Sequence, residues 1–222
     1  MFKTEELFDL SHTAAAQFLS GFEYPYEALP HIKDFIKSLI MTLSEDEFYS
    51  PSEGVMISKK ATVAPTACIN GPAVIFEGAE IRHCAYIRGA VLVGKNCVVG
   101  NSTELKNCIL FDKTAVPHFN YVGDSILGYC SHLGAGAVIS NVKSDKTNIV
   151  VREGDTRIET GLRKFGAMVG DFVEVGCNSV LNPGTVIGRN STVYPGSRVR
   201  GVIPEDCICK SGKNVIIKKT NK

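Results

Sequence analysis

Large apolar residues recur every six positions through most of the chain. An unbroken run of them is followed by two further runs in the same spacing: Ile57, Val63, Ile69, Ile75, Ile81, Ile87, Val93, Val99, Leu105 and Phe111, then Leu127, Leu133 and Ile139, then Val169, Val175, Leu181, Ile187, Val193 and Val199. A strand alternates every two residues and a helix repeats near 3.6, so neither element explains a period of six. The spacing predicts a solenoid whose large aliphatic side chains point into the coil.

A second set of positions supports the same interpretation. Four residues after each apolar position of the first run stands a residue that is nearly always small or β-branched: Ala61, Ala67, Ala73, Ala79, Ala85, Val91, Cys97, Thr103, Ile109 and Ala115. Each hexapeptide then supplies one short strand and one close corner. Glycines such as Gly94 and Gly176, directly after the aliphatic position, provide permissive backbone there. We therefore expect a mainly β fold, a parallel β-helix of hexapeptide repeats.

The first 50 residues lack the repeat and predict a small N-terminal helical subdomain. After Pro30, apolar residues follow helical spacing at Ile32, Phe35, Ile36 and Leu39, and residues 4–7 indicate a shorter helix before it. We expect this subdomain, residues 1–50, to pack on the solenoid or on a neighbouring subunit.

The remaining chain divides into the solenoid, an insertion and a tail. The β-helix is predicted over 51–209, with an inserted loop at about 140–167 in which residues 148–151 and 156–160 read as a hairpin arm leaving the coil. Protruding loops on rigid scaffolds commonly carry function. The basic segment 210–222 is expected to be a frayed or exposed C-terminal tail.

Charge and cysteine content exclude several classes of function. The chain has 24 Lys+Arg against 23 Asp+Glu, a net charge of +1, and so lacks the basic field that drives nucleic-acid binding. Its start is acidic where a signal peptide needs a basic end, and no stretch approaches the roughly 18 apolar residues of a membrane span. Eight cysteines include no C-x2-C pair and are read as reduced core residues. A cytoplasmic protein without membrane insertion is expected.

The strongest candidate for chemistry lies where the repeat fails. From Phe111 to Leu127 the spacing is 16 residues where three repeats need 18, and the irregular stretch includes Pro117 and His118. A histidine at such a defect is a candidate general base, because a neutral imidazole accepts a proton at cytosolic pH.

The motifs around His118 resemble a known family of enzymes. The repeat is similar to that of the hexapeptide-repeat transferases, which implies a left-handed β-helix. More specifically, the segment 118–125 (HFNYVGDS), with 101–107 (NSTELKN), 134–136 (GAG) and 140–142 (SNV), resembles the acetyltransferase domain of bifunctional N-acetylglucosamine-1-phosphate uridyltransferase/glucosamine-1-phosphate acetyltransferase. The similarity spans about residues 57 to 204. It implies an acetyl-CoA-dependent N-acetyltransferase acting on an amino-sugar 1-phosphate, in a homotrimer with its site between subunits.

The resemblance also implies roles for individual residues. His118 matches the general base and Asn141 a residue at the junction of the acceptor and acetyl-CoA sites. The substrate-binding residues it implies are Arg88, Lys106, Tyr121 and His132, of which Arg88 and Lys106 match the contacts to the sugar phosphate. Positions that line the acetyl-CoA groove in the family are Ala135, Cys177 and Pro195. No metal ligand is implied.

Departures from the family pattern leave alternatives open. Val142 stands where relatives usually have tyrosine, His132 replaces an asparagine, and Cys177 replaces a serine. We also expect the chain to lack a uridyltransferase domain of its own, because no Gly-rich nucleotide loop precedes the coil in this sequence. A non-catalytic sugar-nucleotide-binding or scaffold protein that partners a separate nucleotidyltransferase is therefore a second hypothesis. A third uses His83, His118 and His132 as metal ligands of a carbonic anhydrase, although their spacing does not match that family's close histidine pair.

Overall fold

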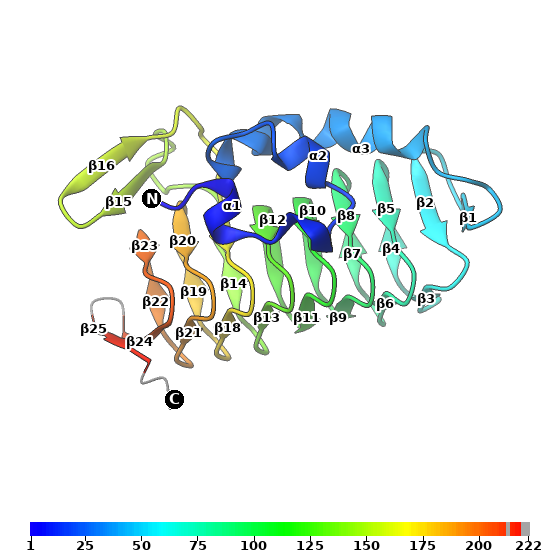
Figure 1. Ribbon diagram of the computed structural model, residues 1–222. Helices are drawn as coiled ribbons and strands as arrows, with labels where there is room; N and C mark the ends of the chain where they lie inside the picture. The colour runs from blue at the N-terminus through cyan, green and yellow to red at the C-terminus, as the bar shows by residue number, and fades with distance from the viewer. Residues whose placement is uncertain (212–213, 219–222) are drawn as a thin grey trace.

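The computed structural model describes residues 1–211 and 214–218 and shows a parallel β-helix with a helical layer along one side (Figure 1). Short strands stack on three faces, and the chain visits each face once per coil. The first face holds β3 (Thr62–Val63), β6 (Glu80–Ile81), β9 (Val98–Asn101), β11 (Ala115–His118), β13 (His132–Leu133), β18 (Glu174–Val175), β21 (Thr192–Val193) and β24 (Cys207–Ser211).

The second and third faces are joined because two strands run around the corner between them. The second face holds β4 (Cys68–Ile69), β7 (Tyr86–Ile87), β14 (Val138–Ile139), β19 (Val180–Leu181) and β22 (Arg198–Val199), and the third holds β2 (Val55–Ser58), β5 (Ala73–Ile75), β8 (Val91–Val93), β17 (Ala167–Val169), β20 (Thr185–Ile187) and β23 (Val202–Ile203). Strands β10 (Glu104–Leu110) and β12 (Tyr121–Leu127) belong to both. We call the turn between the first and second faces the first corner, and that between the second and third the second corner.

The coil interior confirms the hexapeptide pattern but corrects its register. The predicted position Phe111 is not inside the coil: Leu110 pairs with Val93 on one side and with Leu127 on the other, while Phe111 packs in the cluster beneath the helices. The interior series therefore runs Leu105, Leu110, Val116, Val122, Leu127. Two steps in it, 105 to 110 and 122 to 127, are five residues long.

This register also corrects the argument that singled out His118. The step from Val116 to Val122 around it is a regular six, so the irregularity does not lie there. The shortened steps fall instead at the second corner, at Asn107 and Asp124, whose φ values are +47° and +48°. Asn and Asp adopt this left-handed conformation more readily than most residues.

The N-terminal residues form the helical layer that covers the third face. It contains α1 (Thr4–Leu7), α2 (Ala16–Leu19) and α3 (Ile32–Ile40), with 3₁₀ turns at Leu10–His12 and Pro25–His31. Its apolar side chains pack on outward-facing residues of the third face: Met56, Val74, Leu92, Ile109, Ile126, Met168 and Val186. The predicted helices at 4–7 and after Pro30 are confirmed, and they pack on the solenoid of their own chain. None of the helices within the described ranges is long and apolar enough to cross a membrane.

Antiparallel strand pairs occur in the insertion and at both ends of the solenoid. Strands β15 (Val150–Glu153) and β16 (Thr156–Glu159) form the predicted hairpin, and β1 (Phe48–Tyr49) pairs antiparallel with β2. Part of the expected C-terminal tail is ordered, because β24 pairs with β25 (Asn214–Ile217). Residues 212–213 and 219–222 of that tail lie outside the described residues.

Candidate active site

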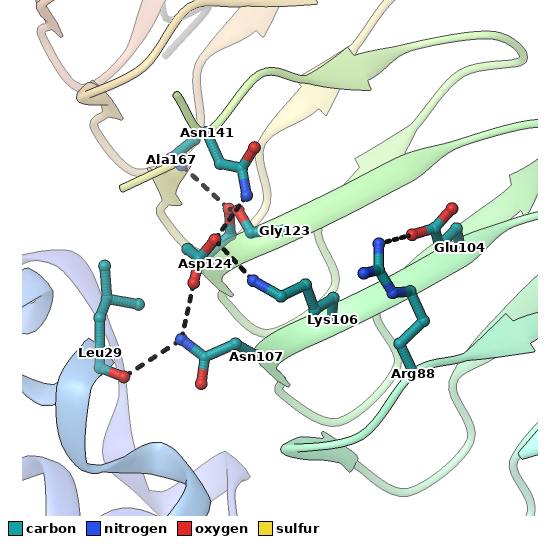
Figure 2. Close-up of polar contacts among 10 residues, drawn as sticks. Leu29, Arg88, Glu104, Lys106, Asn107, Gly123, Asp124, Asn141 and Ala167 are labelled. Atoms are coloured by element: carbon teal, nitrogen blue, oxygen red, sulfur yellow. Dashed lines mark hydrogen bonds and ion pairs between the residues drawn. The ribbon is translucent and has the colours of Figure 1, made fainter. Parts of the chain in front are cut away.

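A nearly buried carboxylate organises the second corner. The side chain of Asp124 is only 5% exposed and lies beside three donors. Lys106 Nζ is 3.4 Å from Asp124 Oδ2, Asn107 Nδ2 donates to Oδ1 at 2.9 Å, and the Asn141 amide donates to Oδ2 (Figure 2). The backbone carbonyl of Asp124 accepts from Gly166 N at 2.7 Å. A buried carboxylate needs such partners, so the network fixes the side chains of Lys106 and Asn141.

The same network ties the N-terminal segment to the corner. Asn107 Nδ2 also donates to the carbonyl oxygen of Leu29, at 3.2 Å, as Figure 2 shows. The side chain of Asn107 therefore bridges the helical layer and the buried carboxylate. The left-handed backbone of Asn107 at the shortened corner lets β10 continue onto the third face without a separate turn.

A cavity of about 440 Å³ opens between this corner and the helical layer. Its walls come from the second corner, from the segment around Leu29 and Pro30, and from the end of the insertion. Four cations line it against the single carboxylate of Asp124: Lys33, Arg88, Lys106 and Lys164. Arg88 Nη1 also lies 2.7 Å from Glu104 Oε1. Neither Lys33 nor Lys164 has an ion pair with any residue in the described ranges. The excess of positive charge suits an anionic ligand.

Tyr121 stands on the second face next to this corner. Burial raises the pKa of the Tyr121 hydroxyl, and the nearby carboxylates of Asp124 and Glu104 raise it further. The phenol therefore remains neutral and can donate a hydrogen bond. A Cβ at Gly123 would lie 2.6 Å from Tyr121 Oη and 2.8 Å from Asn141 Nδ2, so only glycine allows these two side chains to approach.

His118 lies at the first corner, in a line of equivalent residues from successive coils that we call the first-corner ladder. In each coil the residue after the ladder position donates its backbone N–H to the ladder carbonyl of the preceding coil. The ladder runs through His83, Asn101, His118, Ala135, Cys177 and Pro195. The structure thus aligns His118 with the three residues that the resemblance assigns to acetyl-CoA. The His118 side chain is exposed.

Within one chain the candidate residues therefore fall into two groups. Arg88, Lys106 and Asn141 gather at the second corner, while His118 belongs to the ladder at the first. His132 belongs to neither group, since its Nδ1 lies 2.8 Å from Glu174 Oε2 on the first face. Of the histidines nominated as metal ligands, His83 contacts Thr66. The described part of the chain contains no group of three or more His, Cys, Asp or Glu residues that could hold a metal ion.

Sequence reasoning missed Asp124, Asn107 and the lysines that the helical layer and the insertion contribute to the cavity. The five-residue steps in the apolar spacing were a usable signal for the first two. No such signal existed for Lys33, because its proximity to the second corner depends on how the helical layer packs.

Two family models match adjoining parts of the chain: the GMPPB C-terminal domain matches residues 69–169, and the bacterial transferase hexapeptide (six repeats) matches residues 166–201. A relative, the bifunctional protein GlmU of Methanococcus maripaludis, is 32% identical over 201 residues, which is 89% of this chain and 49% of that protein. The bifunctional sugar-1-phosphate nucleotidylyltransferase/acetyltransferase of Sulfurisphaera tokodaii is 36% identical over 59% of this chain and 37% of its own length.

Among solved structures, the polySia-specific acetyltransferase NeuO matches with a TM-score of 0.51 and 15% identity, over 81% of this chain and 85% of that one. This likeness concerns the fold alone. The repeat, the fold and the family matches define the chain as a hexapeptide-repeat β-helix of the bacterial transferase type.

Within that class, the chain is homologous to the acetyltransferase region of the GlmU proteins. It spans about half the length, or less, of the curated relatives described above.

Proposed function

We propose that this chain transfers the acetyl group of acetyl-CoA to the amine of an amino-sugar 1-phosphate of the glucosamine-1-phosphate type. The observation that carries the proposal is the cation-lined cavity at the second corner, held by the buried Asp124 network and lying across the second face from His118. Homology to the GlmU acetyltransferase region supports the reaction type.

The acceptor phosphate fits the second corner. Arg88 and Lys106 are held in place by Glu104 and Asp124, so they offer charge-assisted hydrogen bonds with little loss of side-chain freedom. Lys33 and Lys164 add positive charge from two other parts of the chain. Tyr121, neutral and half-buried, is placed to donate to a sugar hydroxyl on the second face.

The amine then points toward the first corner. The second face is about three strand residues wide, roughly 10 Å at ~3.3 Å per residue, which is the scale of one phosphorylated sugar. His118 accepts the proton of the amine as its nitrogen attacks the thioester carbonyl. The new C–N bond forms, the C–S bond breaks, and the coenzyme leaves as a thiolate that takes up a proton.

The acetyl donor fits the first-corner ladder. Ala135, Cys177 and Pro195 leave a track of small side chains that begins one coil beyond His118. We propose that acetyl-CoA lies along this track in a homotrimer, with the neighbouring subunit closing the groove. Phe119 and Tyr194, each next to a ladder residue, are 60% and 42% exposed, and apolar rings at such positions suit a subunit interface. Analytical ultracentrifugation tests the trimer.

The reaction is tested by thiol release from acetyl-CoA with glucosamine-1-phosphate, galactosamine-1-phosphate and unphosphorylated glucosamine. His118→Ala should abolish turnover with an unchanged melting temperature. His83→Ala is the matched control, because His83 holds the same ladder position two coils earlier. Release that survives His118→Ala, or is lost equally in His83→Ala, would contradict the role of His118. No release with any amino-sugar phosphate would contradict the function.

A second candidate is a non-catalytic scaffold that binds a sugar nucleotide. Three departures from the pattern that the resemblance implies favour it: His132, which contacts Glu174, stands in place of asparagine, the exposed Val142 in place of tyrosine, and Cys177 in place of serine. Binding of acetyl-CoA separates the two functions. A scaffold should show no rise in melting temperature with acetyl-CoA, whereas the enzyme should show one.

A further inference from the structure

The inserted hairpin is fixed against the last coils of the solenoid. Ile149 and Val151 are fully buried, and their side chains approach Gly184, where an added Cβ would lie 2.7 Å from Ile149 Cγ2. At Gly201, one coil further, an added Cβ would lie 2.4 Å from the carbonyl oxygen of Arg152. Both glycines have φ of +78°. The hairpin therefore packs in one fixed position at the second corner, beside β20 and β23 (Figure 1).

The other face of the hairpin carries an unusual pair of charges. Alternation along β15 turns Val150 and Arg152 away from the buried side, and Arg157 of β16 stands directly opposite Arg152. Like charges directly opposite each other destabilise an antiparallel pair. Arg200, on the neighbouring coil, adds a third guanidinium to the same place.

These arginines surround a small cavity of about 80 Å³. Val150 and Pro183 form its apolar part, and its polar part is cationic throughout: Lys143, Arg152, Arg157 and Arg200. No carboxylate lines it. Among residues 1–211 and 214–218, Arg152 and Arg200 have no ion pair, and Arg157 lies 3.7 Å from Glu159. Lys143 is held by Thr147 and the Asn148 carbonyl, and lies 3.7 Å from Asp145.

We propose that this hairpin cavity is an anion site for a single phosphate group, separate from the cavity at Asp124. A bound phosphate places negative charge between Arg152 and Arg157 and relieves their repulsion. Guanidinium groups present paired N–H donors that match phosphate oxygens. The volume equals that of about two to three water molecules, which admits one phosphate but not a sugar phosphate.

The position of the site leaves two sources for the phosphate. Pro183 and Arg200 occupy the second corner one and two coils beyond Asn141, so the cavity continues the same edge of the solenoid. The phosphate is either that of a free inorganic ion, where one group of pyrophosphate enters the cavity and the other stays outside, or the 3′-phosphate of a coenzyme that leaves the first-corner ladder and crosses the second face. The two sources share their recognition chemistry and are separated by experiment.

The test uses the Arg152→Gln/Arg157→Gln double variant, with Arg163→Gln/Arg198→Gln as a control of equal charge loss outside the cavity. Both are made in a Lys106→Met background, which weakens anion binding at the Asp124 cavity. Pyrophosphate binding is measured by calorimetry at constant ionic strength. The background protein should bind pyrophosphate, the Arg152/Arg157 variant roughly tenfold or more weakly, and the control nearly unchanged.

Thermal unfolding distinguishes phosphate binding from a purely structural role of the two arginines, because the change in melting temperature should differ in sign between the two salts. In chloride, removing the two facing arginines should leave the melting temperature unchanged or raise it, since their repulsion is gone; in pyrophosphate the order should reverse. Comparing the binding of coenzyme A with that of dephospho-coenzyme A then identifies the source of the phosphate, because only a site for the 3′-phosphate distinguishes these two ligands. Two results would overturn the proposal and show only an adventitious cluster of charge. One is that the background protein has the same melting temperature in chloride and in pyrophosphate. The other is that both double variants lose the same amount of pyrophosphate binding.

Discussion

Replacing Asp124 by asparagine tests whether the buried carboxylate holds the second corner together. The substitution keeps the shape of the side chain but removes its charge. One of the two amide donors, Asn107 or Asn141, then faces an NH₂ group instead of an acceptor, and Lys106 loses its counter-ion. An unsatisfied buried donor costs about 1–3 kcal/mol, and hydrogen bonds to charged groups are worth about 1.5–3 kcal/mol. We expect a loss of roughly 2–3 kcal/mol in unfolding free energy.

The chain contains a matched control for this change. Asp34 and Lys37 on α3 are also 3.4 Å apart, but their side chains are 83% and 57% exposed, against 5% and 25% for Asp124 and Lys106. Exposed pairs contribute little to stability, so Asp34→Asn should leave the melting temperature nearly unchanged.

Thermal unfolding followed by circular dichroism gives the comparison. For a chain of this size ~1 kcal/mol corresponds to roughly 2–4 °C, so Asp124→Asn should lower the melting temperature by about 4–12 °C. Because Asn107 also bonds Leu29, hydrogen exchange around residue 29 should accelerate in the same variant. Equal melting temperatures for Asp124→Asn and Asp34→Asn would refute the reasoning, since burial would then have no part in the strength of the pair.

Three further predictions follow from individual residues. Lys33→Met should raise KM for the phosphorylated acceptor several-fold, with little change in kcat or in KM for acetyl-CoA, because the substitution removes one cation from the cavity wall. Lys37→Met, on the same helix, should change none of these constants. Steady-state kinetics measure them, and identical effects of both variants would rule out the role of Lys33. Phe111→Ala should cost about 3–5 kcal/mol, measured by urea unfolding, since its ring is fully buried between the helical layer and the coil at 5.0 Å from that of Phe8; a loss under ~1 kcal/mol would show that the layer does not depend on this contact. The pKa of Tyr121 is raised, so the folded state keeps the phenol proton at pH values above the ordinary pKa of about 10. The contribution of this group to the free energy of unfolding is complete below that pH and declines as pH rises through the folded-state pKa. Tyr121→Phe should flatten the dependence of unfolding free energy on pH in that range, and an unchanged dependence would contradict the burial argument.

The error at Phe111 shows how a correct pattern can still give a wrong register. Leu110 and Phe111 are adjacent and both large and apolar, so a strict count of six cannot tell which points inward. The five-residue step at Asn107 moves Leu110 into the coil, and the pairing of Leu110 with Val93 fixes it there. Because side chains alternate along a strand, the one-residue shift turns Phe111 toward the helices.

The helical layer left a trace in the sequence that the count of six does not use. Strands of the third face are apolar at three consecutive positions, as in 73–75, 91–93 and 167–169, and all of these residues are buried. Such runs are typical of strands covered on both sides. They identify which of the three faces lies beneath the helices.

The sequence alone determined the repeat, and with it the coil, because the period of six is local and each hexapeptide carries its own strand and corner. The sequence also nominated His118, Ala135, Cys177 and Pro195 through the family resemblance, but only the stacked coils align them in the first-corner ladder. The tertiary structure decided what lies at the second corner. Lys33, Asn107, Asp124 and Lys164 meet there because a helical layer and an insertion, distant in sequence, pack against two shortened turns, and long-range packing of that kind leaves no periodic signal in the chain.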